Sequence, residues 1–189
     1  MARALITGCS TGIGRATAVE LTKRGHEVVA TARTPAVLDD LHVALRLPLD
    51  VSSDASVAAA VDAAGPIDIL VNNAGIGVGG PIERVPLADA QALFDTNVWG
   101  AVRMVQALAP GMRARSRGWI VNISSAMGRA VAPLAGFYAG SKWALEALSE
   151  AMQTELGHFG INVLVIEPGY IATPMLEREG NAVDRKSVV

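Results

Sequence analysis

The chain has 189 residues, of which 51% are hydrophobic and 18% charged, a composition typical of one globular domain with a sizeable core. Its formal net charge of −2 gives no electrostatic basis for binding nucleic acid or an anionic membrane surface. No apolar run approaches the roughly 20 residues that span a bilayer, and a single cysteine excludes an internal disulfide, so we expect a cytoplasmic protein in a reducing compartment.

Short apolar segments alternate with helical segments along the whole chain. The sequence predicts strands at residues 4–6, 27–32, 45–49, 67–72, 118–123 and 161–167. It predicts helices at residues 13–24, 35–41, 53–64, 87–109 and 136–159, the fourth of which should end near Pro110-Gly111. Strands without polar alternation, separated by helices, indicate a parallel sheet covered on both faces. No repeat or linker interrupts the pattern, so we expect a single α/β domain over residues 1–189, a doubly wound parallel sheet flanked by helices.

A glycine-rich loop, Thr7-Gly8-Cys9-Ser10-Thr11-Gly12-Ile13-Gly14, joins the first strand to the first helix. Glycines let the backbone turn tightly and let a diphosphate approach the amides at a helix N-terminus. The spacing differs from Gly-x-Gly-x-x-Gly, and a purely structural turn is the alternative. Cys9 is interpreted as a small residue beside the nucleotide, because no histidine is near it in sequence to make it a reactive thiol. The predicted nucleotide contacts are Gly8, Ser10, Thr11, Gly12, Ile13 and Gly14.

The end of the second strand bears on the choice between NAD and NADP. A carboxylate there would hold a free ribose hydroxyl, whereas an arginine would hold a 2′-phosphate. The segment 28–33 ends in Arg33 and has no carboxylate at its end, so we favour NADP(H), with NAD(H) as the second choice. A solvated loop arginine is the alternative for Arg33, and Arg15, in the first turn of the first helix, is a weaker candidate for the same phosphate.

Two further strand ends carry polar residues. After the third strand, Asp50-Val51 could meet the adenine ring, or Asp50 could cap the next helix. Ser52 and Ser53 are the other candidate caps of that helix. After the fourth strand, Asn72-Asn73-Ala74-Gly75 forms a polar turn at the carboxyl edge of the sheet, where such folds bind ligands.

Tyr138 and Lys142 lie four residues apart in a segment predicted to be helical, so their side chains share one face. A lysine ammonium beside a phenol stabilises the phenolate and should lower a pKa that is about 10 in a model peptide. Such a phenol can give a proton to a carbonyl, or take one from an alcohol, in a hydride-transfer reaction. Most pairs at this spacing are ordinary helix-surface neighbours, so the pair gains its meaning from the other motifs.

The glycine loop, the turn after the fourth strand and Tyr138-x-x-x-Lys142 make the chain resemble the short-chain dehydrogenases/reductases over about residues 2–174. The resemblance implies a Rossmann-like fold and a catalytic serine at Ser125, thirteen residues before Tyr138, to which Ser124 is a poorer match. The implied catalytic set is Asn97, Ser125, Tyr138 and Lys142. The implied substrate contacts are Ser125, Tyr138 and Met127. The further cofactor contacts are Asn73, Ala74, Gly75, Tyr138, Lys142, Pro168, Gly169, Ile171 and Thr173.

The resemblance implies an NADP(H)-dependent oxidoreductase that interconverts a carbonyl and a secondary alcohol, with Tyr138 as acid and base. Ser125 would hydrogen-bond the substrate oxygen, and Lys142 would hold the nicotinamide ribose. Asn97, through its backbone carbonyl and a water, would connect Lys142 to solvent. The expected partner is a small hydrophobic alcohol or carbonyl compound. The alternative is a truncated, non-catalytic nucleotide-binding or scaffold protein of the same fold.

The end of the chain departs from the family pattern. After Thr173-Pro174 the family usually has a substrate loop with one or two helices and then a seventh strand, whereas only residues 175–189 follow here. We therefore expect the last strand and the substrate lid to be missing. The sixth strand would then form an apolar edge of the sheet.

The helices at 87–109 and 136–159 contain more apolar residues than one buried face needs. In the family these helices form a subunit interface, so a homodimer or homotetramer is expected, the alternative being that all of this surface faces the protein's own core. The three histidines are dispersed without metal-ligand spacing, and no metal site is expected. Packing roles rather than substrate contacts are predicted for Trp99, Trp119 and Trp143.

Overall fold

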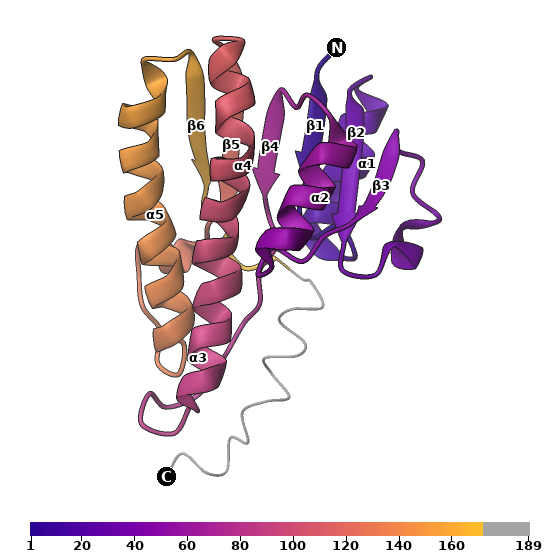
Figure 1. Ribbon diagram of the computed structural model, residues 1–189. Helices are drawn as coiled ribbons and strands as arrows, with labels where there is room; N and C mark the ends of the chain where they lie inside the picture. The colour runs from indigo at the N-terminus through magenta and orange to yellow at the C-terminus, as the bar shows by residue number, and fades with distance from the viewer. Residues whose placement is uncertain (172–189) are drawn as a thin grey trace.

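The computed structural model describes residues 1–171, which form one six-stranded sheet with flanking helices (Figure 1). The strand order is β3-β2-β1-β4-β5-β6, and all neighbouring strands run parallel. The strands are β1 Arg3–Ile6, β2 Glu27–Ala32, β3 Leu45–Pro48, β4 Ile69–Asn72, β5 Gly118–Ile123 and β6 Ile161–Ile166. The order runs outward from β1 in one direction and from β4 in the other, which confirms the predicted doubly wound, Rossmann-like arrangement.

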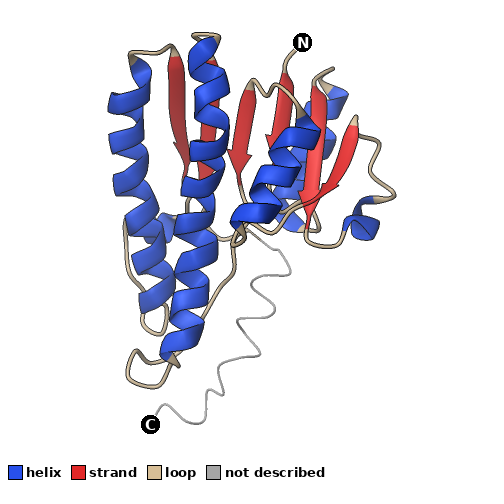
Figure 2. Cartoon of the chain, in the orientation of Figure 1, coloured by secondary structure: helices blue, strands red, loops and turns tan. Residues whose placement is uncertain are grey.

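Helices cover the sheet, with α2 and α4 on one face and α1 on the other (Figure 2). The helices are α1 Gly12–Lys23, α2 Asp54–Ala64, α3 Leu87–Phe94, α4 Gly100–Ala114 and α5 Gly136–Gly157. Three short helical segments are η1 Pro35–Leu38, η2 Asp95–Trp99 and η3 Ala126–Gly128. At the start of α2, Ser53 is the capping residue, because its side chain accepts a hydrogen bond of 3.3 Å from the amide of Ser56.

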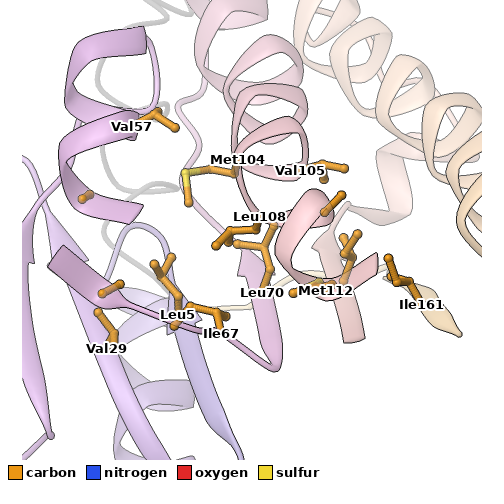
Figure 3. Close-up of a cluster of buried hydrophobic side chains, with 14 of the residues drawn as sticks. Leu5, Val29, Val57, Ile67, Leu70, Met104, Val105, Leu108, Met112 and Ile161 are labelled. Carbon is orange, nitrogen blue, oxygen red and sulfur yellow. The ribbon is translucent and has the colours of Figure 1, made fainter. Parts of the chain in front are cut away.

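Two apolar clusters hold the layers together. Successive residues of a strand point to opposite faces, so Leu5 and Ile6 of β1 enter different clusters, and the strands must be apolar throughout. Figure 3 shows the cluster under α2 and α4, in which Met104 and Leu108 of α4 lie near Leu70 of β4. The cluster on the α1 side contains, among others, Ile6, Ala18, Val28, Ala30, Val71 and Ile123.

The helical segment after β4 continues further than the sequence predicts. The predicted end near Pro110-Gly111 is wrong, because α4 contains Pro110 and runs on to Ala114. The proline ring faces the carbonyl of Gln106, four residues earlier, but both residues are exposed, and a helix can bend on its solvent side. Between α3 and α4, η2 is a π-helical turn, a feature that occurs frequently at functional sites.

The strand β6 forms one edge of the described sheet, as the sequence predicts. Its residues Leu164 and Ile166 are 48% and 49% exposed. They pair with Val121 and Ile123 of β5, and the register places all four on the face that carries α1 farther along the sheet. Within residues 1–171, no helix covers this end of that face closely enough to bury them.

The three tryptophans do not fill the core. Trp99, Trp119 and Trp143 are 51%, 44% and 48% exposed, so the predicted packing roles are wrong. Leucine, isoleucine, valine, alanine and methionine side chains fill the interior in their place. Trp99 follows α3 and Trp143 belongs to α5, so both lie in the segments predicted to form a subunit interface.

Candidate active site

Six loops carry predicted site residues, and each of them follows a strand. The glycine loop follows β1, Arg33 follows β2, Asp50-Val51 follows β3, the Asn73 turn follows β4, Ser125 follows β5 and Pro168-Gly169 follows β6. Because all of these strands are parallel, their carboxyl ends meet at one edge of the sheet. The turn η2 and the N-terminal half of α5 carry the remaining predicted site residues that the structure describes.

The glycine loop and the Asn73 turn are joined by hydrogen bonds. Thr7 Oγ1 accepts from the backbone amides of Asn73 and Ala74, at 3.0 and 2.9 Å. In the other direction, Asn73 Nδ2 donates to the carbonyls of Thr7 and Gly8, at 2.8 and 3.0 Å. Asn73 therefore supports the shape of the loop with its side chain, a role that the sequence alone does not reveal.

Two glycines of the loop have no room for a side chain. A Cβ on Gly14 would lie 2.3 Å from Asn73 Nδ2 and 2.5 Å from the carbonyl oxygen of Gly8. Gly8 has a φ of +73°, and a Cβ there would lie 2.8 Å from the Cα of Ala74. Gly12 also has a positive φ, of 60°. The lack of a side chain at Gly14 thus lets the start of α1 lie close to the loop after β1 and to the Asn73 turn.

The N-terminus of α1 fits a diphosphate. Thr11 occupies the N-cap position with extended backbone, and among the described residues its side chain makes no capping hydrogen bond. Ser10 and Thr11 are exposed, and the glycines on either side leave the backbone accessible. The first amides of an uncapped helix are unsatisfied donors at the positive end of the helix dipole, which favours an anionic group.

Cys9 lies inside this loop but is not a reactive thiol. It is fully buried, and its S–H donates to the carbonyl of Ile6 at 3.3 Å. Burial raises the pKa of the Cys9 thiol to about 12, so the thiolate is not formed near neutral pH. The residue is a small packing group, as the sequence predicts.

The residues predicted to select the cofactor lie at the ends of β2 and β3. Arg33 directly follows β2 and is exposed. Arg15 is engaged elsewhere, since its guanidinium forms an ion pair with Asp40 and donates to the carbonyl of Val37 at 3.2 Å. Arg33 is therefore the better placed of the two arginines to meet a 2′-phosphate.

Asp50 braces the loop after β3 and is not the cap of α2. Its Oδ1 accepts from the hydroxyl and the amide of Ser52, at 2.6 and 3.0 Å. These two hydrogen bonds, with a smaller contribution from Arg33, lower the pKa of the Asp50 carboxyl. The side chain of Val51 is buried against Gly100, so a contact with an adenine ring at this position would fall to its backbone.

Asn97 lies in the π-helical turn η2 and is 2% exposed. Its side chain amide binds both backbone groups of Ile76: Oδ1 accepts from the amide at 2.8 Å and Nδ2 donates to the carbonyl at 2.9 Å. Nδ2 also donates to Ser141 Oγ at 3.2 Å, and Ser141 Oγ donates to the carbonyl of Tyr138 at 2.7 Å. Asn97 thus connects the segment after β4 to the turn of α5 that carries Tyr138.

Lys142 is buried at the centre of the site, with an exposed fraction of 6%. Its Nζ donates to the carbonyl of Ile123, the last residue of β5, at 2.8 Å and lies 5.7 Å from the centroid of the Tyr138 ring. Burial lowers the pKa of Lys142 to about 8, while Glu146 acts in the opposite direction. An ordinary surface pair at this spacing would leave its lysine in water, so the surface alternative does not hold.

Ser125 follows β5 by two residues and is the N-cap of the short helix η3. Its Oγ accepts from the amide of Met127 at 3.1 Å, and a hydroxyl that accepts one hydrogen bond still has its own proton to donate. The turn after β6 is attached to the same loop, because the amide of Ala126 donates to the carbonyl of Pro168 at 2.9 Å. Ser124 is buried, and its Oγ has no hydrogen-bond partner within residues 1–171.

One group near the site is absent from the sequence prediction. Glu146 lies one turn after Lys142 on α5 and is 7% exposed. Its Oε2 accepts from Arg129 Nη2 at 3.1 Å, and Arg129 Nε donates to Glu167 Oε1 at 2.9 Å. The spacing of four residues between Lys142 and Glu146, the same as between Tyr138 and Lys142, is the signal that could have identified it.

Two predicted cofactor contacts lie at or beyond the end of the described residues. Ile171 is the last described residue and is 45% exposed. Thr173 lies outside the described residues.

Among residues 1–171, no group of three or more histidine, cysteine, aspartate and glutamate side chains is arranged to hold a metal ion. No helix in that part of the chain is long and apolar enough to cross a membrane.

Comparisons with known proteins agree with this arrangement. The family model described as short chain dehydrogenase matches residues 2–184. Retinol dehydrogenase 8 from Homo sapiens is 42% identical over 197 residues, which cover 97% of this chain and 62% of that protein. The NADPH-dependent pterin aldehyde reductase from Arabidopsis thaliana is 41% identical over 184 residues, which cover 91% of this chain and 76% of that protein. The structure of 3-ketoacyl-(acyl-carrier-protein) reductase from Brucella melitensis complexed with NADH has a TM-score of 0.90 at 31% identity and is matched over 93% of this chain and 78% of its own.

Proposed function

Because the chain belongs to the short-chain dehydrogenase family, we propose that it is an NADP(H)-dependent oxidoreductase that interconverts a carbonyl and a secondary alcohol. The observation that carries this proposal is the pairing of Tyr138 with a buried Lys142 on α5, 5.7 Å between the ammonium and the ring centroid. The pair belongs to the helix that packs against η3, the short helix that Ser125 begins. A buried cation beside a phenol is what proton transfer to an oxygen requires.

In the proposed reaction, the hydroxyl of Tyr138 protonates the carbonyl oxygen during reduction and takes the alcohol proton during oxidation. Ser125 donates a hydrogen bond to the same oxygen and stabilises the charge that develops there. Lys142 stabilises the phenolate form of Tyr138, and the backbone carbonyl of Asn97 receives the water through which the proton is replaced. A bound nicotinamide cofactor would supply or accept the hydride.

The residues that would hold the cofactor follow the carboxyl edge of the sheet. The amides at the start of α1 would bind the diphosphate, and the turns after β4 and β6 would lie along the rest of the molecule. Lys142 would bind the ribose next to the nicotinamide. The exposed Arg33 and the missing carboxylate at the end of β2 favour the 2′-phosphate of NADP, and the Arabidopsis relative is named as NADPH-dependent.

The choice of cofactor is tested by replacing Arg33. We expect Arg33→Ala to raise the Kd for NADPH by about tenfold or more, since a charge-assisted hydrogen bond contributes about 1.5–3 kcal/mol. The Kd for NADH should stay unchanged, because NADH has no 2′-phosphate. Arg24→Ala removes an arginine from the opposite end of α1 and is the matched control. Equal losses of NADPH and NADH affinity in Arg33→Ala would contradict the assignment.

We propose a small hydrophobic alcohol or carbonyl compound as substrate, bordered by Met127, and a homodimer or homotetramer as the assembly. The substrate class is supported by the human relative, which is named as a retinol dehydrogenase. The assembly is supported by large apolar side chains at the surface of the α3 to α5 region. These are Leu87, Trp99, Trp143 and, just after α5, Phe159, each more than two fifths exposed.

The function as a whole is tested by cofactor fluorescence together with a panel of ketones and aldehydes. We expect NADPH fluorescence to change on binding and NADPH to be consumed with at least one hydrophobic carbonyl compound. NADPH binding without consumption on any member of the panel would indicate a non-catalytic nucleotide-binding protein of the same fold. Absence of NADPH and NADH binding would contradict the proposal altogether.

A further inference from the structure

We infer that Glu146 is a positioning residue for the proposed reaction: its buried carboxylate keeps the ammonium of Lys142 charged inside the site. The inference rests on the proposed function for its effect on turnover, but the charge of Lys142 can be measured without any turnover. Neither the motif Tyr138-x-x-x-Lys142 nor the glycine loop includes this glutamate.

Lys142 lacks a charged hydrogen-bond partner within the described chain. Its Nζ donates to the neutral carbonyl of Ile123, although the side chain is only 6% exposed. A buried ammonium without an opposite charge loses much of its hydration free energy and tends to become neutral. A charged Lys142 at this position therefore needs a carboxylate close to it.

Glu146 is a helix neighbour of Lys142 on α5. Residues four apart on a helix are neighbours on the same face, with Cβ atoms about 5–6 Å apart. Glu146 stands in this relation to Lys142 and is itself only 7% exposed, so little water screens the two charges from each other. Glu150, the next residue in the same series, is exposed and lies one turn further away.

The two oxygens of the Glu146 carboxylate have different surroundings. Its Oε2 accepts from Arg129, which is 63% exposed, whereas Oε1 is buried and has no hydrogen-bond partner within residues 1–171. Gly128 leaves room for this arrangement, because a Cβ there would lie 3.0 Å from Glu146 Oε1 and 2.8 Å from Ser124 Oγ. Arg129 therefore fixes one oxygen from the solvent side and leaves the other inside the protein.

The charged and titratable groups around Lys142 come from three elements. Tyr138 and Glu146 belong to α5, Arg129 follows η3 and Glu167 follows β6. Burial lowers the pKa of Lys142 to about 8, and Glu146 raises it against that effect. When the charge of Glu146 is removed, the pKa of Lys142 falls further, so the amine of Lys142 loses its proton at a lower pH. Tyr138 would then lose the cation that stabilises its phenolate.

The charge of Lys142 is measured by NMR in the cofactor-free protein. The chain has three lysines, so replacing Lys23 and Lys186 by arginine leaves Lys142 as the single ¹³Cε lysine signal. We expect Glu146→Gln to lower the midpoint of its titration by about one pH unit or more, the usual effect of removing a close opposite charge. Glu150→Gln, the matched control, should leave the midpoint in place. An unchanged midpoint in Glu146→Gln would overturn the inference.

A second variant separates this role from a structural one. Arg129→Met breaks the same ion pair but removes a positive charge, so we expect the midpoint of Lys142 to rise or stay, never to fall. If Glu146 only held the loop in place, both variants would disturb Lys142 in the same direction. A lowered midpoint in Arg129→Met would therefore overturn the inference, even if Glu146→Gln failed to fold.

The consequence for turnover is read from the pH profile. If catalysis needs the charged Lys142, activity falls as the pH rises through its pKa, and in Glu146→Gln this fall should move to lower pH. A profile that stays in place while the NMR midpoint moves would overturn the catalytic part of the inference. If the wild-type chain turns over no substrate while Glu146→Gln shows the expected NMR shift, the proposed function is refuted and the charge relation is supported.

Discussion

The side chain amide of Asn73 can bind the glycine loop only because residue 14 is a glycine. Asn73 Nδ2 binds the carbonyls of Thr7 and Gly8, and it occupies the space that a Cβ on Gly14 would need. The residue predicted as a cofactor contact is therefore first a support of the loop. Asp50 likewise supports its own loop, because its carboxylate accepts a hydrogen bond from the hydroxyl of Ser52. Polar residues at this edge of the sheet build the site before any ligand binds.

One methyl group added at Gly14 should therefore destabilise the fold. We expect Gly14→Ala to lower the free energy of unfolding by about 1–3 kcal/mol, because overpacking forces the backbone and Asn73 apart. The matched control is Gly140→Ala on α5, where the new Cβ would meet only Phe94 Cζ at an ordinary 3.7 Å. That change should be neutral or stabilise by up to about 1 kcal/mol, since alanine is the better helix former. Urea unfolding of both variants checks the pair, and equal midpoints would contradict the steric argument.

At the scale of elements, η2 connects the two halves of the site. Its π-helical turn carries Asn97, which binds the segment after β4 on one side and Ser141 of α5 on the other. The long helical segment is thus more than a cover of the sheet. It holds the turn near the cofactor edge and the helix of the proposed acid in a fixed relation.

Removing the amide of Asn97 should therefore weaken the fold itself. We expect Asn97→Ala to lower the free energy of unfolding by about 1–3 kcal/mol, because the partly buried amide and carbonyl of Ile76 lose their partner. Gln91→Ala, which removes an exposed amide from α3, is the control and should change stability little. Thermal unfolding of the two variants decides, and an Asn97→Ala variant as stable as wild type would argue against this connecting role.

The sequence predicts the strands and the larger helices well, because strand and helix periods are local properties. The bounds of β2 and β5 are the predicted ones, and the others differ by a few residues. The end of α4 is missed because the cost of Pro110 depends on which side of the helix faces water. The role of Asn73 is missed for a different reason, because it depends on contacts between loops after different strands, which no local pattern encodes. The spacing of Glu146 from Lys142 is local, but its burial depends on the packing of α5 against η3 and could not be read from the sequence.

At the scale of the whole molecule, two regions of apolar surface differ in position. One lies on the α3 to α5 side with Trp99 and Trp143, and the other on the opposite face of the sheet with Trp119 and Leu164. Exposed apolar areas of this kind often mark contacts with other chains. The proposed homo-oligomer uses the first region only.

The tryptophans allow a matched test of that proposal. We expect the double change Trp99→Gln and Trp143→Gln to shift sedimentation velocity profiles toward the monomer at micromolar concentration, because two large apolar contacts are lost. Trp119→Gln removes a tryptophan of similar exposure from the other face and should leave the assembly unchanged. A monomeric wild-type protein, or dissociation caused by Trp119→Gln alone, would contradict the proposed interface.

If Tyr138, held beside the buried Lys142, transfers the proton in an NADP(H)-dependent reaction, its hydroxyl is needed for turnover but not for binding of the cofactor. NADPH oxidation by Tyr138→Phe with the best carbonyl substrate of the panel, together with the Kd of this variant for NADPH, is the decisive measurement. We expect a Kd close to that of the wild type and a rate that is lower by at least about 100-fold, the usual contribution of a positioned general acid. A Tyr138→Phe variant that binds NADPH and turns over at the wild-type rate would show that Tyr138 is not the acid.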